Sequence, residues 1–275
     1  MLTTVHLTPR IGTEIRLDRC ALLNGSKAGE IRKLLEERGV LVFRQLHLTD
    51  AEQLALTSTL GELADQNGAK MMKVTLDKSE MGPDKAYLAE YLKGAFYWHI
   101  DKSVADVPSL ASLLTARRLS QTGGQTEFAN TYAAWEDLPD AEKHALANLK
   151  IVHTIEASQR YVNPEPGYAE LKGWQERYKP KTHPLVWTHR SGRKSLILGS
   201  TTARVDSMNI EEGNLLLCRL REWATQPQFV YRHEWTPGDL VIWDNTGTMH
   251  RVLPYPLDSG RLMHRTVLEG EEPIA

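Results

Sequence analysis

Hydrophobic positions near the start of the chain follow a helical spacing in two places and a strand-like run in a third. Residues 26–39 (SKAGEIRKLLEERG) carry apolar side chains at helical spacing and end on a glycine. Residues 48–63 repeat that spacing behind Thr49 or Asp50 as the cap. Between them, residues 39–45 (GVLVFRQ) form an apolar run typical of a short buried strand. The pattern predicts an N-terminal α/β portion.

Residues 65–96 lose this regularity. They contain Gly, Pro, Lys and Met without a steady period. Long irregular stretches inside a compact domain are often functional loops. The sequence therefore predicts a lid over a site, and a plain surface insertion fits it equally well.

From residue 97 onward the pattern is mainly strand-like. Turn residues separate short β-rich runs at 97–101, 111–119, 149–155, 184–190, 194–200, 229–235, 239–245 and 261–270. Two helices interrupt them, at residues 133–149 and 211–225. Many short strands favour a jelly roll over a doubly wound parallel sheet. Without an internal repeat or linker, residues 1–275 are expected to form one domain: an N-terminal portion (1–96) and a jelly-roll core (97–275).

Composition narrows the class of protein without selecting a function. The 275 residues are 41% apolar and 25% charged, with a formal net charge of -2. That charge gives no attraction to nucleic acid or to an acidic membrane surface. No apolar run approaches the roughly 20 residues that a membrane span requires. The N-terminus lacks the features of a secretory signal, and two cysteines cannot build a disulfide framework. We therefore expect a cytoplasmic protein.

The first candidate site is the pair His99 and Asp101 in YWHID. On a strand, side chains repeat every two residues, so the imidazole and the carboxylate project from one face. Together they offer two adjacent ligands for a divalent metal. The motif is short, and on its own it fits a structural hydrogen-bonded pair better.

A third ligand has to come from elsewhere in the fold. His250 follows the predicted strand at residues 239–245. In a jelly roll, strands far apart in sequence lie face to face, so this histidine can complete a site with His99 and Asp101. Two histidines and one carboxylate form the facial triad of non-haem iron(II) oxygenases, with three coordination positions open. By itself, His250 also fits a loop or core histidine.

Arg265 and Thr126 are candidates for binding an anion. Arg265 lies on the last predicted strand, fifteen residues after His250. A guanidinium matches a carboxylate with two parallel hydrogen bonds and stays charged when buried, so a dicarboxylate would suit it. Thr126, after the Gly123-Gly124 pair, offers a hydroxyl to the same carboxylate, although a lone threonine also fits as strand filler. Arg261 shares the face of Arg265 by parity but sits at a turn, and we expect it to be solvated.

The order of these motifs is more specific than any one of them. They are the H-x-D step at 99–101, TGGQTEF at 122–128, FVYRHEWTPGDLVIWDN at 229–245, His250, and R-x-x-x-R-T at 261–266. With this combination the chain resembles the Fe(II)/2-oxoglutarate-dependent dioxygenases of the taurine and phenoxyacetate type. The resemblance runs from GVLVFRQ to the terminal RTVLEG, and it is closer to the phenoxyalkanoate branch.

The resemblance implies a double-stranded β-helix in which His99, Asp101 and His250 bind iron(II). It implies that 2-oxoglutarate chelates the metal through its keto acid end, while its distal carboxylate meets Arg265 with Thr126 beside it. O2 is the other cosubstrate. A small organic molecule is then oxidised while 2-oxoglutarate is converted to succinate and CO2.

The expected substrate is an organic anion such as a sulfonate, a sulfate ester or a phenoxy acid. Ala95 and Phe96 are apolar where taurine-type enzymes carry polar residues, which argues against taurine itself. Lys73, in the expected lid, is a candidate substrate-binding residue. Lys102 and Ser103, directly after the carboxylate ligand, are two more. Lysines in a loop fit a solvated surface equally well.

Two other functions stay open at this point. A jelly-roll protein without catalytic activity could keep the metal and 2-oxoglutarate for structure or sensing. A zinc hydrolase on the same scaffold is the third possibility, because two histidines and a carboxylate also suit zinc. The resemblance further implies a homodimer or a homotetramer.

Overall fold

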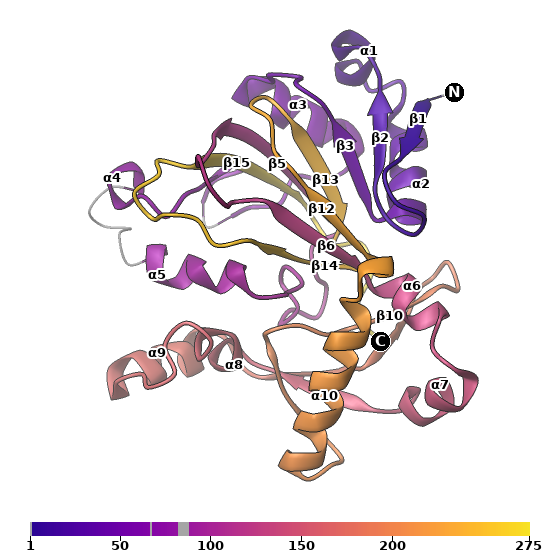
Figure 1. Cartoon of the computed structure of the whole chain (residues 1–275), viewed down its shortest axis with the longest axis vertical. Helices are drawn as coiled ribbons and strands as arrows, with labels where there is room; N and C mark the ends of the chain where they lie inside the picture. Colours follow the sequence, from indigo (N-terminus) through magenta and orange to yellow (C-terminus); the bar gives the residue numbers. More distant parts are fainter. Residues whose placement is uncertain (1, 67, 82–87) are drawn as a thin grey trace.

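The computed structural model describes residues 2–66, 68–81 and 88–275, and its main layer is a seven-stranded sheet (Figure 1). The strands lie in the order β1 (Thr3–His6), β2 (Thr13–Arg16), β3 (Val40–Phe43), β13 (Leu240–Asp244), β5 (Ala111–Arg118), β15 (Leu262–Leu268) and β4 (Met72–Val74). Neighbours are antiparallel except β2 and β3, which run parallel. The N-terminal portion thus supplies strands to the same sheet as the core.

A three-stranded antiparallel sheet faces this layer. It consists of β12 (Val230–His233), β6 (Thr126–Asn130) and β14 (Thr248–Val252). The space between the sheets is filled from both sides, by Val241, Leu114 and Met263 from the large sheet and by Phe128 and Tyr231 from the small one. The predicted packing of β-sheets is therefore present.

Three helices cover the outer face of the large sheet: α1 (Arg19–Leu23), α2 (Ala28–Arg38) and α3 (Asp50–Leu60). Leu113 on β5 points to these helices, whereas its neighbour Leu114 points between the sheets, as strand alternation requires. Thr49 caps α3 in a capping box with Glu52, which confirms one of the two predicted caps. α2 ends at Gly39, whose φ of 70° favours glycine.

The outer face of the small sheet packs against α6 (Thr131–Glu136) and α10 (Ile210–Ala224). The remaining elements of this half are α7 (Asp140–Leu146), β7 (Lys150–His153), α8 (Ile155–Gln159), α9 (Tyr168–Arg177), β8 (Lys181–Pro184), β9 (Val186–Thr188), β10 (Lys194–Leu196), β11 (Thr202–Val205) and the 3-10 turn η3 (Pro227–Phe229). β11, β7 and β8 form a further small sheet, and β10 pairs with β9. These strands lie beside α10 (Figure 1).

Several predicted elements differ from the structure. The single helix expected at residues 133–149 is two helices, because Pro139 is the N-cap of α7 and disfavours helical geometry in the residue before it. The strand expected at 97–101 is reduced to one isolated bridge at His99. β6 and β14, which carry Thr126 and His250, were not among the predicted strands, since neither has the continuous apolar run of its neighbours.

The expected lid falls partly outside the described residues, which omit 67 and 82–87. The described part contains the edge strand β4, the short helices α4 (Lys78–Met81) and α5 (Leu88–Leu92), and the 3-10 turn η2 (Lys93–Phe96). β4 pairs with β15, opposite Arg265 and its neighbours. Whether residues 65–96 close over a site remains a prediction.

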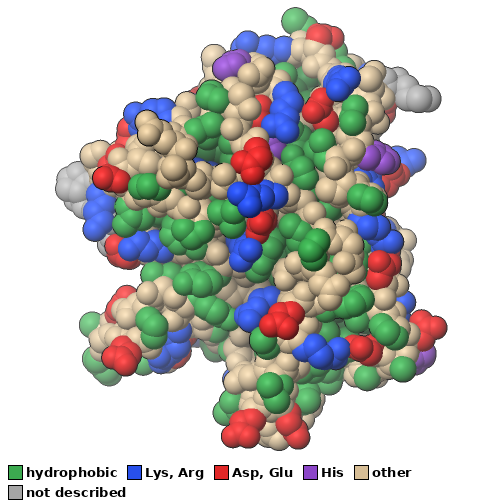
Figure 2. Space-filling model, in the orientation of Figure 1, with side chains coloured by type: hydrophobic (Ala, Val, Ile, Leu, Met, Phe, Trp, Pro, Cys, Tyr) green, Lys and Arg blue, Asp and Glu red, His purple; other side chains and the backbone are tan. Residues whose placement is uncertain are grey.

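Charged side chains of both signs mix on the surface. On the face shown in Figure 2, Lys and Arg side chains alternate with Asp and Glu over the small sheet. In the described part of the chain, no helix has both the length and the apolar character needed to cross a membrane.

Candidate metal centre and anion sites

The two candidate histidines are joined through their backbones. His99 N donates a hydrogen bond to the carbonyl of His250 at 3.0 Å, and His250 N donates to the carbonyl of His99 at 2.9 Å. Gly199 lies against this segment with a φ of 125°, and a Cβ there would sit 3.0 Å from the His99 Cα. The close approach requires glycine. The bridge therefore fixes both histidines on neighbouring, tightly packed backbones.

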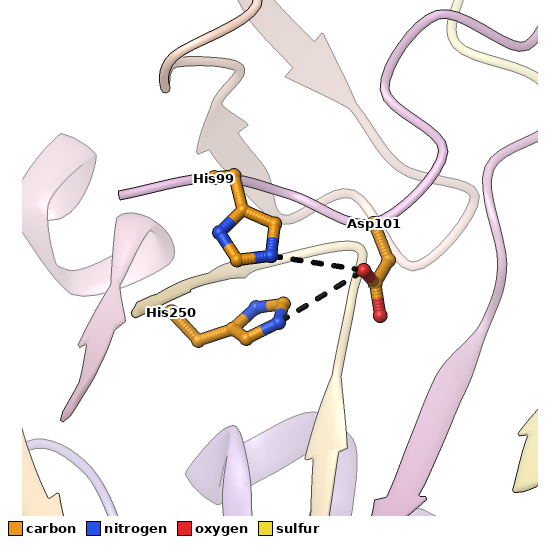
Figure 3. Close-up of side chains that lie close together, drawn as sticks. All are labelled: His99, Asp101 and His250. Atoms are coloured by element: carbon orange, nitrogen blue, oxygen red, sulfur yellow. Dashed lines mark ion pairs between the residues drawn. The ribbon is translucent and has the colours of Figure 1, made fainter. Parts of the chain in front are cut away.

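Asp101 joins the two imidazoles at one point. Its Oδ1 lies 3.8 Å from His99 Nε2 and 3.9 Å from His250 Nε2 (Figure 3). One ligand atom from each residue lies within 4.8 Å of the others, and this is the one group of three such residues in the described part of the chain. Figure 3 shows the imidazole nitrogens pointing at the same carboxylate oxygen. The predicted convergence of His99, Asp101 and His250 is present.

The imidazoles are oriented as metal ligands. His99 Nδ1 lies 2.8 Å from the carbonyl oxygen of Tyr97, which can only accept, so Nδ1 carries the proton and the Nε2 lone pair faces Asp101. The His250 ring packs on Trp243, with ring centroids 4.7 Å apart, and near Phe128. These contacts hold both rings in place before any ion binds.

The charges in the site also favour metal coordination. Burial lowers the pKa of His250 well below its usual range, and the neighbouring His99 lowers it further. His250 is therefore neutral at neutral pH, as a metal ligand must be. Burial raises the pKa of Asp101, but Arg265 and the two imidazoles outweigh it, and the net pKa lies far below the usual value. Two imidazoles and one carboxylate suit iron(II).

Arg265 lies at the metal end of the site. Its Nη1 is 3.4 Å from each oxygen of Asp101, and its Nε donates to Gln66 Oε1 at 3.3 Å. Arg265 projects from β15 between the sheets, on the same face as the buried Met263. The guanidinium therefore directly neighbours the carboxylate of the three candidate ligands.

Arg261 is buried, and the prediction that it is solvated is wrong. Only 3% of it is exposed, because its guanidinium turns inward under the Tyr255 ring, 4.8 Å from the ring centroid. Its Nη2 donates to the Gly124 carbonyl at 3.2 Å, and its Nε has no partner in the described structure. Tyr255, rather than a carboxylate, is the group that offsets the burial of its charge. The sequence did contain an indication of this orientation, because Arg261 is four residues before Arg265 and so shares its strand face. Its position at a turn led to the opposite expectation.

Thr126 and Arg261 are linked through Gly124. Gly124, the acceptor for Arg261, stands two residues before Thr126. The Thr126 Oγ1 is buried and accepts a hydrogen bond from Trp235 Nε1 at 2.9 Å. Because Trp235 can only donate, the hydroxyl proton of Thr126 stays free to donate to an anion.

The polar contacts of the three candidate substrate residues are with residues other than the metal-ligand candidates, Arg261, Arg265 and Thr126. Lys73 Nζ is 3.7 Å from Glu80, and Lys102 Nζ is 3.8 Å from Glu269. Ser103 is buried, with its hydroxyl 2.8 Å from Thr201 Oγ1. Substrate binding by Lys73, Lys102 and Ser103 remains a prediction.

The chain also matches known proteins along most of its length. The family model described as taurine catabolism dioxygenase TauD, TfdA family matches residues 3–267. An alpha-ketoglutarate-dependent 2,4-dichlorophenoxyacetate dioxygenase from Burkholderia sp. (strain RASC) is 33% identical over 93% of this chain and 91% of its own. An alkylsulfatase from Acinetobacter baylyi is 33% identical over 96% of this chain and 84% of its own.

A solved structure supports the same relationship. The crystal structure of AAD-2 in complex with Mn(II) and N-oxalylglycine superposes with a TM-score of 0.84 at 33% identity and covers 100% of both chains. The predicted jelly-roll fold, dioxygenase class, iron(II) and 2-oxoglutarate are thereby confirmed. The chain belongs to the TauD, TfdA family and is a 2-oxoglutarate-dependent dioxygenase.

Proposed function

We propose that this dioxygenase oxidises a small organic acid, with phenoxy acids and sulfate esters as the first candidates. The observation that carries the proposal is a pair of guanidiniums from the last strand and the turn before it: Arg265 contacts Asp101, and Arg261 is buried against Gly124. Two cations in one interior suit two anions, a cosubstrate and an acidic substrate. The relatives from Burkholderia and Acinetobacter are named as a 2,4-dichlorophenoxyacetate dioxygenase and an alkylsulfatase.

His99, Asp101 and His250 are the proposed metal ligands. They would hold iron(II) through two imidazole nitrogens and one carboxylate oxygen, a donor set that leaves coordination positions for the keto acid and O2. When bound, iron(II) supplies the redox chemistry that couples 2-oxoglutarate decarboxylation to substrate oxidation. The protein fixes the ligands through the His99–His250 backbone bridge and surrounds them with aromatic rings that keep bulk water out.

The distal carboxylate of 2-oxoglutarate is best served by Arg261 and Thr126. The keto acid end binds the metal, so the other end reaches away from it. Arg265, 3.4 Å from Asp101, stands too near the metal to meet that far end. We therefore assign Arg261 and Thr126 to the distal carboxylate, and Arg265 to the anionic groups at the metal, including the keto acid carboxylate. This revises the role expected for Arg265 while keeping it in the cosubstrate site.

An aromatic wall supports a substrate with an apolar body. η2 packs against β14, which carries His250. Phe96 from η2 meets Tyr255 edge to face, with ring centroids 5.8 Å apart. An aryl ring can pack on such a surface with favourable edge contacts. Phe96 is also, with Ala95, one of the two apolar residues that separate this chain from the taurine-type pattern.

A turnover screen tests the proposal. The protein, purified without O2 and loaded with iron(II), is given 2-oxoglutarate with phenoxyacetates, alkyl sulfates or sulfonates, and succinate is measured. We expect a phenoxy acid or sulfate ester to stimulate succinate formation, and His99→Ala to abolish the stimulation. If no acid stimulates turnover although 2-oxoglutarate binds, the non-catalytic binding protein becomes the better interpretation.

Two arginine variants test the cosubstrate assignment. Removing a buried charged partner costs about 2–5 kcal/mol, so Arg261→Met should raise the KM for 2-oxoglutarate by roughly 30-fold or more. Arg261→Lys, which keeps the charge but not the fork, should recover only part of this loss. An unchanged KM in Arg261→Met together with a large rise in Arg265→Met would return the distal carboxylate to Arg265.

We also propose a homodimer or homotetramer that works in the cytoplasm. Large apolar side chains stand exposed at Tyr168, Ile210 and Leu215, which a partner copy could cover. Cys20 and Cys218 are both free thiols, as expected in a reducing compartment. Light scattering coupled to size-exclusion chromatography measures the assembly, and a monomeric mass would exclude it.

A further inference from the structure

The two carboxylate oxygens of Asp101 have different surroundings. Oδ1 faces both imidazoles, 3.8 Å from His99 and 3.9 Å from His250. Oδ2 instead accepts a hydrogen bond from Ser112 Oγ at 2.9 Å. One oxygen is therefore turned to the metal position, and the other is held by a hydroxyl from β5.

Ser112 is itself held in one orientation. Its Oγ accepts a hydrogen bond from Asn245 Nδ2 at 3.0 Å. A serine hydroxyl has a single proton, and a carboxylate only accepts. With the Asn245 amide donating to it, the Ser112 proton is directed at Asp101. Both residues are fully buried, so water does not compete for these bonds.

The strand arrangement sets the geometry of this chain of hydrogen bonds. Ser112 lies opposite Trp243 in the register between β5 and β13, and Asn245 follows the end of β13. Asn245 N donates to the carbonyl of Leu110 at 2.9 Å, which fixes its backbone beside β5. The hydrogen bonds thus run from Asn245, at the end of β13, through Ser112 on the neighbouring strand β5 to the carboxylate of Asp101.

We propose that Ser112 and Asn245 are positioning residues that keep Asp101 bound to the metal through a single oxygen. This inference rests on the proposed metal site. A carboxylate can bind through one oxygen or two. With two imidazoles and one oxygen, three positions stay open, two for a keto acid and one for O2. If Asp101 bound through both oxygens, only two would remain, and the keto acid and O2 would compete.

Loss of the Ser112 hydroxyl has two expected effects. Outer contacts to metal ligands typically change metal affinity or activity by about 10- to 100-fold, so Ser112→Ala should weaken Mn(II) binding within that range. Oδ2, left with Arg265 Nη1 at 3.4 Å as its neighbour, should then also disturb the coupling of the reaction. We expect more succinate formed per substrate molecule oxidised than in the native enzyme.

The experiment compares Ser112→Ala, Asn245→Ala, the double variant and Ser109→Ala in the whole protein. Ser109 is a matched control, because its buried hydroxyl has no hydrogen-bond partner in the described structure. Mn(II) affinity is measured by titration with electron paramagnetic resonance, and the ratio of succinate to oxidised substrate is measured with iron(II). Melting temperatures report folding of each variant.

The supporting result has three parts. Ser112→Ala loses Mn(II) affinity while Ser109→Ala does not. Asn245→Ala loses less and has no further effect in the Ser112→Ala background, because it acts through Ser112. Ser112→Thr, which restores a hydroxyl, regains affinity. Equal behaviour of Ser112→Ala and Ser109→Ala, or additive losses in the double variant, overturns the proposal.

His99→Ala separates this inference from the metal site on which it rests. If His99→Ala binds Mn(II) as tightly as the native protein, the proposed metal site is wrong. If His99→Ala loses Mn(II) but Ser112→Ala does not, only the positioning role is wrong. Should Ser112→Ala fail to fold, Asn245→Ala decides: a raised succinate ratio supports the role, and a native ratio overturns it.

Discussion

Among the residues that the structure describes, two pairs of histidines lie in ring contact, and one of the two has the form of a metal site. The rings of His99 and His250 are 4.1 Å apart between centroids, and those of His153 and His183 are 5.6 Å apart. All but His99 are buried. The first pair faces the Asp101 carboxylate, whereas the second belongs to no group of three ligand residues in the described ranges.

The second pair is tied into the fold by neutral groups. His153 Nδ1 lies 3.0 Å from Thr201 Oγ1, and Thr201 in turn lies 2.8 Å from the Ser103 hydroxyl. The Nε2 atoms of His153 and His183 have no hydrogen-bond partner in the described structure. Close imidazoles alone therefore do not make a metal centre. A carboxylate that both nitrogens face distinguishes the two pairs.

The largest expected difference between the pairs is in metal affinity. Removing a direct ligand should exceed the cost of removing an outer contact, so His250→Ala should weaken Mn(II) binding by more than about 100-fold. His153→Ala should leave Mn(II) affinity within about 2-fold of the native value, because that residue lies outside the triad. Isothermal titration of both variants makes the comparison. Loss of Mn(II) binding in His153→Ala would contradict the distinction between the two histidine pairs.

A smaller loss of Mn(II) affinity is expected when the Asp101 carboxylate, which the first pair faces, loses its charge. Asp101→Asn keeps an oxygen donor but removes the negative charge that holds the cation. We expect Mn(II) affinity to fall by about 10- to 100-fold, less than for His250→Ala. The same titration provides the value. A native affinity in Asp101→Asn would mean that the imidazoles alone bind the ion.

The second pair should appear instead in the pH dependence of stability. Burial lowers the pKa of His153 to about 3, below the value of about 6.5 in an unfolded chain. Between those values the unfolded chain binds a proton that the folded chain does not. The free energy of unfolding is therefore complete above pH 6.5 and falls below it, by about 2 kcal/mol at pH 5 from this group.

Chemical denaturation of the native protein and of His153→Asn at pH 5 and pH 7 measures this term. The amide cannot be protonated in this range, so the stability lost between the two pH values should be smaller in His153→Asn. Other buried histidines contribute to both proteins and cancel in the comparison. Equal losses would show that His153 is not the group responsible.

The smallest expected effect comes from the hydroxyl between His153 and Ser103. Thr201→Val is close in shape but lacks the Oγ1 that both residues contact. Leaving a buried polar group without its partner costs about 1 kcal/mol or slightly more. Thermal melting should show a lower melting temperature, and Mn(II) affinity should be unchanged. A weaker Mn(II) affinity would connect the two histidine pairs.

The sequence predicted the triad because its residues carry short-range signals. The spacing of His99 and Asp101 placed both side chains together, and the combination of motifs identified His250 as the third ligand. The strand expected around His99 was not needed, since a single bridge gives the same orientation. Most strands and helices follow the hydrophobic pattern for the same reason, that burial acts on local periodicity.

Residues whose position depends on contacts between distant strands were missed. Arg261 sits beside a turn, which favours exposure locally, yet the ring of Tyr255 and the carbonyl of Gly124 draw it inward. Ser112 looks like an ordinary strand residue until the register of β5 and β13 brings Asn245 to it. No local pattern encodes that register, so such contacts require the three-dimensional structure.

The backbone bridge between the two histidine ligands also bears on how the protein folds. A slip of one residue at this bridge would put Trp98 or Arg251 in the place of an imidazole ligand. The ion can be captured only by chains that have aligned these segments correctly. A metal ion bound by all three ligands would therefore stabilise the native alignment of these two segments over any shifted one.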